Sequence, residues 1–218
     1  MNTTRVVLAV VLVGLAAGCA NVERSRDTAN PNVSGNTLAL QVCSNCHGLT
    51  GVTVSPNFPN LAAQTEPYLV AQLTAFKGHA RRDPAGFEYM WGLSRSLSES
   101  QIQGLAAYFS GQAPARLPAG ADAQRLAAGR AIFENGIAER SIPACSSCHG
   151  ATGAGIGPFP RIASQHADYL VKQLVVFQRT EERTEERPGG SIMKTVAHSL
   201  RPQDIADVAA YLQAMPGA

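Results

Sequence analysis

The chain has 218 residues, of which 45% are apolar and 6% aromatic, and its formal net charge is +2. This length suffices for one medium domain or two small ones. The balanced charge argues against a nucleic-acid-binding protein, which would carry a strong basic excess on one face. The low aromatic content favours a large apolar cofactor as part of the buried material.

The N-terminus is typical of an export signal. After Arg5 comes an apolar run, VVLAVVLVGLAA, which ends at Ala17 and is shorter than the about 20 residues that a membrane-spanning helix needs. The stretch LAAGC is similar to the cleavage box of bacterial lipoproteins, so residues 1–18 are predicted to be removed and Cys19 to carry a lipid. Cleavage by the ordinary signal peptidase, with Cys19 lost, is the alternative. The mature protein is expected in the periplasm, held at a membrane by a flexible tether over 19–33.

An internal repeat organises the rest of the chain. The stretch CSNCH recurs as CSSCH at an offset of about 102 residues, and two further segments match in register. These are PNFPNLAAQTEPYLVAQLTAF with GPFPRIASQHADYLVKQLVVF, and MWGLSRSLSESQIQGLAAYF with MKTVAHSLRPQDIADVAAYL. Such a match predicts two copies of one unit. We expect a first domain over 34–112, a Pro- and Gly-rich linker over 113–122 and a second domain over 123–218.

Both copies are predicted to be helical. Apolar residues recur at helical spacing in each, at Leu69, Leu73 and Phe76 and again at Leu170, Leu174 and Phe177. Ser98 with Gln101 forms a capping-box pattern before an apolar run. Pro202 opens the equivalent helix in the second copy. We find no alternating pattern typical of a strand, so the expected fold class is all-α.

The repeated motif CxxCH carries the chemistry. The halves of a CxxC zinc site are usually about 15–20 residues apart, and a thioredoxin-like pair belongs in a βαβ setting. Neither fits this chain, whereas covalent c-type haem does: two thiols bind the vinyl groups and the adjacent histidine binds the iron. Buried or disulfide-paired cysteines are a weaker alternative, because the motif occurs twice at matched positions. The sequence therefore predicts two covalently attached haem c groups, held by Cys43, Cys46 and His47 and by Cys145, Cys148 and His149.

The second axial ligand of each iron must come from elsewhere. The candidates are His79 and Met90 in the first copy and His166, Met193, His198 and Met215 in the second. A duplicated unit should duplicate its ligand, and only Met90 and Met193 are in register. Although a lone methionine is usually core filler, this matched pair is predicted to supply the ligands, and the histidines are predicted to have surface or pocket roles.

Other matched positions have weaker interpretations. Pro56 and Pro158 each follow a haem histidine by nine residues, and their carbonyls could orient its ring; a loop-shaping role is equally favoured. Tyr68 and Tyr169 are expected to pack against the haems.

Together these motifs resemble dihaem cytochromes c of the c4 type over about 34–218. The resemblance implies two tandem class I cytochrome c-like domains related by a pseudo-twofold axis, with the haem edges facing each other. It also implies electron transfer between periplasmic or membrane-bound redox proteins, often toward a haem–copper terminal oxidase. The lipid anchor and the run TEERTEER depart from the pattern and leave the partner open.

His/Met ligation raises the reduction potential and occupies the sixth position of the iron. The first hypothesis is therefore an electron carrier with no enzymatic activity. A redox subunit docked permanently to a dehydrogenase or oxidase is the alternative. A dihaem enzyme such as a peroxidase is less favoured, because it needs an open or displaceable ligand.

Overall fold

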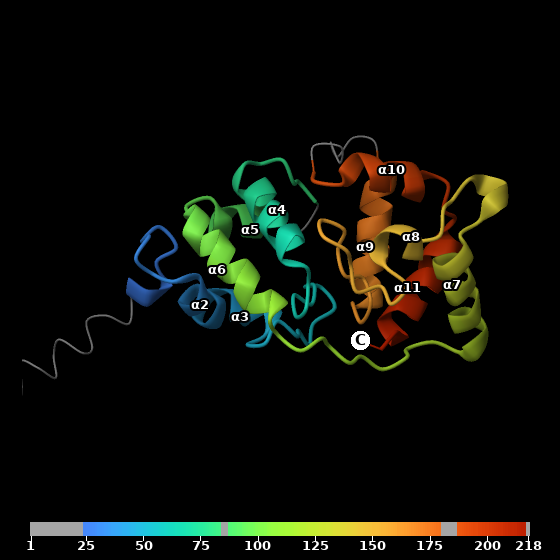
Figure 1. Ribbon diagram of the computed structural model, residues 1–218, viewed down its shortest axis with the longest axis horizontal. Coiled ribbons are helices and arrows are strands. Elements are labelled where there is room, and N and C mark those ends of the chain that lie inside the picture. Colours follow the sequence, from blue (N-terminus) through green and yellow to red (C-terminus); the bar gives the residue numbers. More distant parts are fainter. Residues whose placement is uncertain (1–23, 84–86, 180–186, 217–218) are drawn as a thin grey trace, which may run out of the picture.

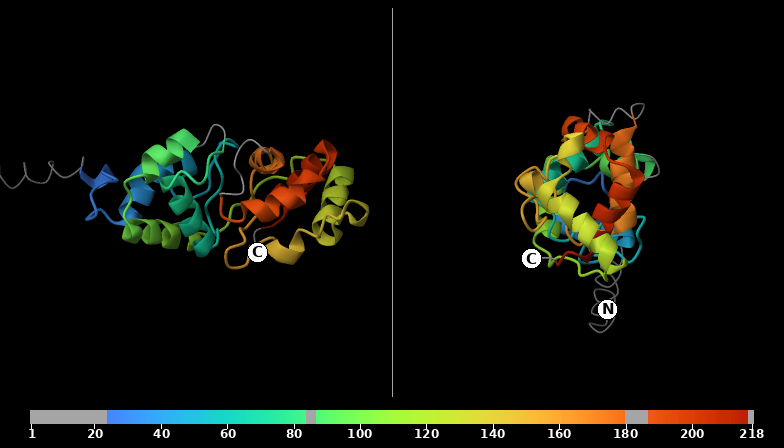
Figure 2. Two further views of the ribbon diagram at one scale, coloured as in Figure 1. Left: turned by 90° about the horizontal axis from the view of Figure 1, so that it is seen from above. Right: turned by 90° about the vertical axis from the view of Figure 1, so that its right-hand side faces the viewer.

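The computed structural model describes residues 24–83, 87–179 and 187–216, with the exception of the Glu88 side chain. These ranges form an elongated molecule in which two helical units follow each other along the long axis (Figures 1 and 2). They contain no strand, only the isolated bridges Ile137–Ile142 and Ile156–Phe159, and no helix long and apolar enough to cross a bilayer. The predicted signal segment over 1–18 and the lipid site Cys19 lie outside the described residues.

The first unit is built around its last helix. Its elements are η1 (Arg24–Arg26), α2 (Gly35–Leu38), the π-helical turn η2 (Ala39–Cys43), α3 (Ser44–His47), α4 (Glu66–Lys77), α5 (Phe87–Ser94) and α6 (Glu99–Ser110). Helices α2 and α4 both pack on α6. The predicted capping box is confirmed: Ser98 accepts from the Gln101 backbone, and the Gln101 side chain accepts from the Ser98 backbone. Leu38, Leu105 and Ala106 are almost completely buried at the centre.

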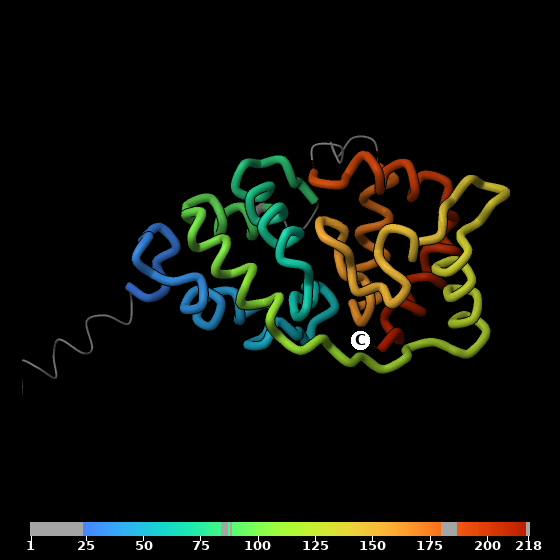
Figure 3. The backbone as a smooth tube through the Cα atoms, viewed as in Figure 1, coloured from blue at the N-terminus to red at the C-terminus, as the bar shows by residue number. Residues whose placement is uncertain are grey.

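The second unit repeats this order. Its elements are α7 (Ala123–Asn135), η3 (Ala138–Arg140), α8 (Ser146–His149), α9 (Ala167–Gln178), α10 (Gly190–His198) and α11 (Pro202–Ala214). Helices α7 and α9 pack on α11, as α2 and α4 pack on α6. Phe133 and Ala209 lie at the core of this unit. The repeat and the all-α fold class are confirmed, and the segment between α6 and α7 runs along one side of the molecule (Figure 3).

The two units differ before their CxxCH motifs. In the first, helical turns continue without a break from Gly35 to His47. In the second, α7 ends at Asn135, the next residue, Gly136, has a φ of 70°, and the Ile137–Ile142 bridge closes a short loop before α8. A Cβ on Gly136 would lie 2.2 Å from the Ile142 carbonyl oxygen, so the loop requires glycine there.

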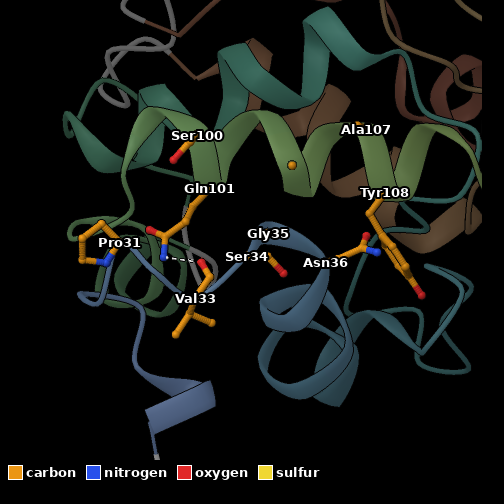
Figure 4. Close-up of a pocket in the computed structure, with 10 residues that line it drawn as sticks. Pro31, Val33, Ser34, Gly35, Asn36, Ser100, Gln101, Ala107 and Tyr108 are labelled. Atoms are coloured by element: carbon orange, nitrogen blue, oxygen red, sulfur yellow. Dashed lines mark hydrogen bonds between the residues drawn. The ribbon is translucent and has the colours of Figure 1, made fainter.

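Residues 24–33, the described part of the tether predicted over 19–33, contact the first unit. Gln101, buried on α6, donates from Nε2 to the carbonyls of Asn30 at 2.8 Å and Val33 at 3.0 Å. Figure 4 shows this side chain reaching down to Val33. Because a buried amide needs partners, it holds the segment against the first unit. Residues 19–23 lie outside the described ranges.

A tight approach of α2 to α6 leads to a stability prediction. A Cβ on Gly35 would lie 2.5 Å from the Leu105 backbone nitrogen and 2.6 Å from the Gly104 carbonyl carbon. Since backbone atoms of a packed helix must then move, Gly35→Ala should lower the free energy of unfolding by about 1–3 kcal/mol. Denaturant titration of the holoprotein measures this. Gly92→Ala is the control, because that site has nothing within 4 Å; an equal loss in both variants would contradict the explanation.

Candidate functional site

The first CxxCH motif lies on continuous helical turns. Cys43 ends η2 and is partly buried, whereas Cys46 in α3 is exposed, and both are free thiols. Residues three apart lie on the same helix face, so both sulfurs are presented on one side. Burial raises the pKa of the Cys43 thiol to about 11. His47, only 7% exposed, follows immediately.

The second motif has the same construction. Cys145 precedes α8, Cys148 lies within it, and both are free and partly buried. Burial raises the pKa of the Cys145 thiol to about 11. His149 is 7% exposed, as His47 is. The two sites therefore present the same groups at matched positions.

Each motif histidine is oriented by a backbone carbonyl. Nδ1 of His47 lies 3.0 Å from the Pro59 oxygen, and Nδ1 of His149 lies 2.8 Å from the Pro160 oxygen. Burial lowers the pKa of both imidazoles, which the carbonyl contact only partly offsets. A neutral ring that donates through Nδ1 keeps the Nε2 lone pair for a metal.

The suggestion that Pro56 and Pro158 supply these carbonyls is wrong. After each motif the chain turns back, because the Gly51 carbonyl accepts from the amides of residues 61 and 62, and the Gly153 carbonyl from those of 162 and 163. This reversal brings the second proline of each loop beneath the histidine. The sequence signal for these two carbonyls is the dipeptide Phe-Pro, which occurs in both loops. Its phenylalanine also contacts the histidine, because the rings of Phe58 and His47 meet edge-on with centroids 6.0 Å apart.

The two candidate methionines occupy equivalent helices. Met90 lies on α5 and Met193 on α10, and both are half-buried. Met193 packs against a core cluster of the second unit, and the Met90 carbonyl accepts from the Ser94 hydroxyl at 2.6 Å. Their assignment as iron ligands stays a prediction.

The remaining histidines have three different environments. His79 meets the rings of Trp91 and Phe87 edge-on, at centroid distances of 4.6 Å and 5.2 Å. His198 is exposed. His166 is buried between the units, where Nε2 lies 3.0 Å from the Thr53 carbonyl oxygen. The sequence did not indicate this last contact.

Reciprocal amide pairs join the two units. Gln64 donates to the Arg161 carbonyl at 2.9 Å and accepts from the Arg161 amide at 2.6 Å. Gln165 does the same with Asn60, at 3.0 Å and 2.8 Å. Both glutamines are buried. Each unit supplies the glutamine of one pair and the backbone partner of the other, as expected for a pseudo-twofold relation. The glutamines end the matched stretches LAAQ and IASQ, which are the signal for these pairs in the sequence.

A largely buried polar cluster, which we call the interdomain cluster, links α4 of the first unit to α9 of the second. It consists of Tyr68, Gln72, Arg81, Asp83, Tyr169, Gln173 and Arg187. Arg81 and Arg187 share the single carboxylate of Asp83, with closest distances of 2.7 Å and 3.4 Å. Burial by itself would raise the pKa of Asp83, but the two arginine charges override it and hold the pKa well below its usual range.

The rest of this cluster repeats across the junction. Each arginine bonds the glutamine of its own unit and the tyrosine of the other: Arg81 with Gln72 at 2.9 Å and Tyr169 at 3.2 Å, and Arg187 with Gln173 at 2.6 Å and Tyr68 at 3.2 Å. Sequence reasoning gave the tyrosines a packing role and missed their hydroxyl contacts. It also missed the arginines, which lie outside the segments that match in register.

The groups present fit a haem at each motif. Paired thiols can form the covalent bonds to the haem vinyl groups, and a neutral buried histidine with Nε2 available and a half-buried methionine can bind the iron. Three buried polar atoms have no partner among the described residues: Thr65 Oγ1, Gln72 Nε2 and Arg161 Nη2. Such orphans call for an additional polar group, and the carboxylates of a haem are of that kind. The pocket of about 520 Å³ beside α2 and α6 is lined by none of the predicted haem-binding residues (Figure 4).

Comparison with known proteins identifies the family to which the chain belongs. The family model Cytochrome c matches residues 33–112 and 126–216. Cytochrome c4 of Pseudomonas aeruginosa is 38% identical over 86% of this chain and 92% of its own length. A solved structure of Acidithiobacillus ferrooxidans cytochrome c4 superposes with a TM-score of 0.70 at 39% identity, over 79% of this chain and 97% of that one. A protein of Thiomonas intermedia named thiosulfate dehydrogenase electron acceptor is 34% identical over 80% of this chain and 78% of its own length.

Proposed function

We propose that this chain, which belongs to the cytochrome c family, is an exported electron carrier. It is a dihaem electron-transfer cytochrome of the c4 type, with a haem c attached covalently at each CxxCH. It takes electrons from one periplasmic or membrane-bound redox protein and delivers them to another. Each haem, when bound, supplies one reversible one-electron couple. The chain's own residues hold, orient and shield these two centres.

We assign His47 with Met90 to one iron and His149 with Met193 to the other. The neutral, carbonyl-oriented histidines and the matched methionines support this assignment. Two occupied axial positions suit electron exchange, since the iron changes charge with little rearrangement of its ligands.

The observation that carries the proposal is the fixed junction between two matched units. The amide pairs of Gln64 and Gln165 and the interdomain cluster bind the units to each other through buried groups. Because these contacts fix the two units to each other, the two one-electron centres keep a constant separation. An electron received by one unit therefore passes to the other without a domain movement.

The state of the two irons tests this function. Reductive titration of the holoprotein should take up about two electrons per chain, and carbon monoxide should leave the visible spectrum of the reduced protein unchanged, because both sixth positions are filled. A spectral shift in one haem of the wild-type protein would overturn the carrier in favour of an enzyme with a displaceable ligand.

The second candidate is a subunit docked to a dehydrogenase for sulfur compounds, which the Thiomonas intermedia relative favours by its name. A thiosulfate-oxidising dehydrogenase should then reduce this protein rapidly and remain bound at high salt. Transient reduction with dissociation supports the free carrier, whose acceptor would include a haem–copper oxidase.

Attachment to the membrane depends on Cys19. We expect wild-type protein to enter the detergent phase and Cys19→Ser to remain in the aqueous phase, because a lipid chain contributes about 0.8 kcal/mol per buried methylene. Detergent-phase partitioning measures this, and equal partitioning of the two proteins would contradict the anchor.

A further inference from the structure

The helix that carries Met90 is held differently from its counterpart in the second unit. Helix α5 packs mainly against α4, and among the described residues no side chain of α5 belongs to the apolar core cluster of the first unit. In the second unit, Met193 and Val196 of α10 pack against a core cluster. Tyr89 and Leu93 of α5 are 75% and 39% exposed. The position of α5 therefore depends on its contacts with α4 and the residues that directly follow α4.

His79, just beyond the end of α4, makes such a contact. Its ring meets those of Phe87 and Trp91 nearly at right angles, at centroid distances of 5.2 Å and 4.6 Å. Residues four apart share one face of a helix, so a single imidazole contacts two aromatic side chains on that face of α5. Perpendicular ring pairs stabilise a contact beyond the area that they bury. His79 thus joins the turn after α4 to the helix of the methionine.

The backbone at His79 is strained, and the ring contacts give the strain a purpose. Its φ is 60°, a left-handed conformation that residues other than glycine rarely adopt, although asparagine and histidine tolerate it better than most. The His79 amide donates to the Phe76 carbonyl at 3.2 Å, and the His79 carbonyl accepts from Nε of Arg82 at 2.8 Å. These bonds fix the turn in the conformation that brings the imidazole to α5.

Trp91 is also held from within its own helix. The Arg95 guanidinium lies 5.1 Å from the centroid of the Trp91 ring, which is within the range of a cation–π contact. In the second unit the residue that matches Trp91 is Lys194, which follows Met193 as Trp91 follows Met90. A lysine cannot form the ring contact, so this way of holding the helix belongs to the first unit.

We propose that His79 is a positioning residue for Met90: its imidazole docks α5 through Phe87 and Trp91 and so keeps the thioether at the iron of the first haem. This inference rests on the assignment of Met90 as an iron ligand of the proposed carrier, and it names the group that holds that ligand in place. Residues that orient a metal ligand govern how firmly the ligand binds. The ring contacts thereby keep the first iron closed to external ligands, a task that core packing performs in the second unit.

The test is imidazole binding to the oxidised holoprotein, in which free imidazole competes with the thioether for the sixth position of the iron. The NMR signals of the two axial methionines report displacement at each haem separately. His79→Asn removes the ring but keeps a residue that tolerates the left-handed conformation. It should raise the apparent affinity for imidazole at the first haem about tenfold, which is about 1.4 kcal/mol, and leave the affinity at the second haem unchanged.

Variants of α5 separate the ring contact from other effects. Trp91→Lys, which copies the second unit, should raise the imidazole affinity of the first haem as His79→Asn does. Trp91→Phe keeps an aromatic ring that can meet His79 and should retain the wild-type affinity. Tyr89→Ser is the matched control and should also retain it, since the Tyr89 ring lies on the same helix but is 75% exposed.

An unchanged imidazole affinity at the first haem of His79→Asn would overturn the inference, even where denaturant titration shows that the variant is less stable. An equal rise at both haems would overturn it too, because the whole fold would then have loosened. A wild-type protein without an axial signal from Met90 would overturn it together with the ligand assignment. Carbon monoxide binding by the wild-type protein would instead remove the carrier function, so these failures are distinguishable.

Discussion

Met90→Ala should open the iron of the first domain and Met193→Ala that of the second, so that each reduced variant binds about one carbon monoxide per chain. The physical reason is that alanine has no donor atom, and the vacated sixth position becomes accessible to a small ligand. The double variant should bind about two. Visible spectra of the reduced protein under carbon monoxide count the open haems.

The same variants should have lower potentials at the affected haem, since the thioether stabilises the reduced iron. Met215→Leu is the control, because Met215 lies at the end of α11 with its carbonyl bonded to Ser164 and was a candidate without a match in the repeat. A Met90→Ala protein that binds no carbon monoxide would exclude Met90 as the ligand and direct attention to His79.

Asp83→Asn should be the most destabilising single change at the domain junction. Among the described residues, Asp83 is the carboxylate that pairs with both Arg81 and Arg187 in the interdomain cluster, and all three side chains are buried. Removing its charge leaves two buried guanidinium groups unbalanced, and breaking a buried pair in this way costs about 3–5 kcal/mol. Denaturant titration measures the loss, and small-angle scattering shows whether the domains separate. Glu134→Gln, in an exposed pair with Arg130, should leave both measurements unchanged.

The pH dependence of this junction follows from the same charges. The pKa of Asp83 is held well below its unfolded value of 3.8, chiefly because the two arginines outweigh the effect of burial. The unfolded chain therefore binds the proton more readily. The contribution of Asp83 is fully present above about pH 4 and falls as the pH drops below that value. The Asn variant should lack this acid-dependent loss; an identical acid profile in both proteins would show that the carboxylate does not stabilise the junction.

How much could be predicted from the sequence depended on how local each feature is. The capping box at Ser98 and the helix start at Pro202 were predictable, because a cap involves residues within one turn. The two haem-binding motifs were predictable for the same reason, since the thiols and the histidine of each motif lie within five residues of one another. The repeat then added long-range information by pairing Met90 with Met193.

Tertiary structure decided the features that join distant residues. The histidine carbonyls proved to be those of Pro59 and Pro160, because glycine turns reverse the loops by an amount that spacing alone does not reveal. Residues 24–33 proved to be packed, because a buried glutamine on α6 required their carbonyls.

The sequence by itself determined the all-α repeat, the haem attachment and the candidate ligands, because each is written in residue type and short spacing. The junction was decided only in three dimensions. Arg81, Asp83 and Arg187 meet there although about a hundred residues separate the last from the first two. Their balance of charge matters because burial removes the water that would screen the same residues on a surface.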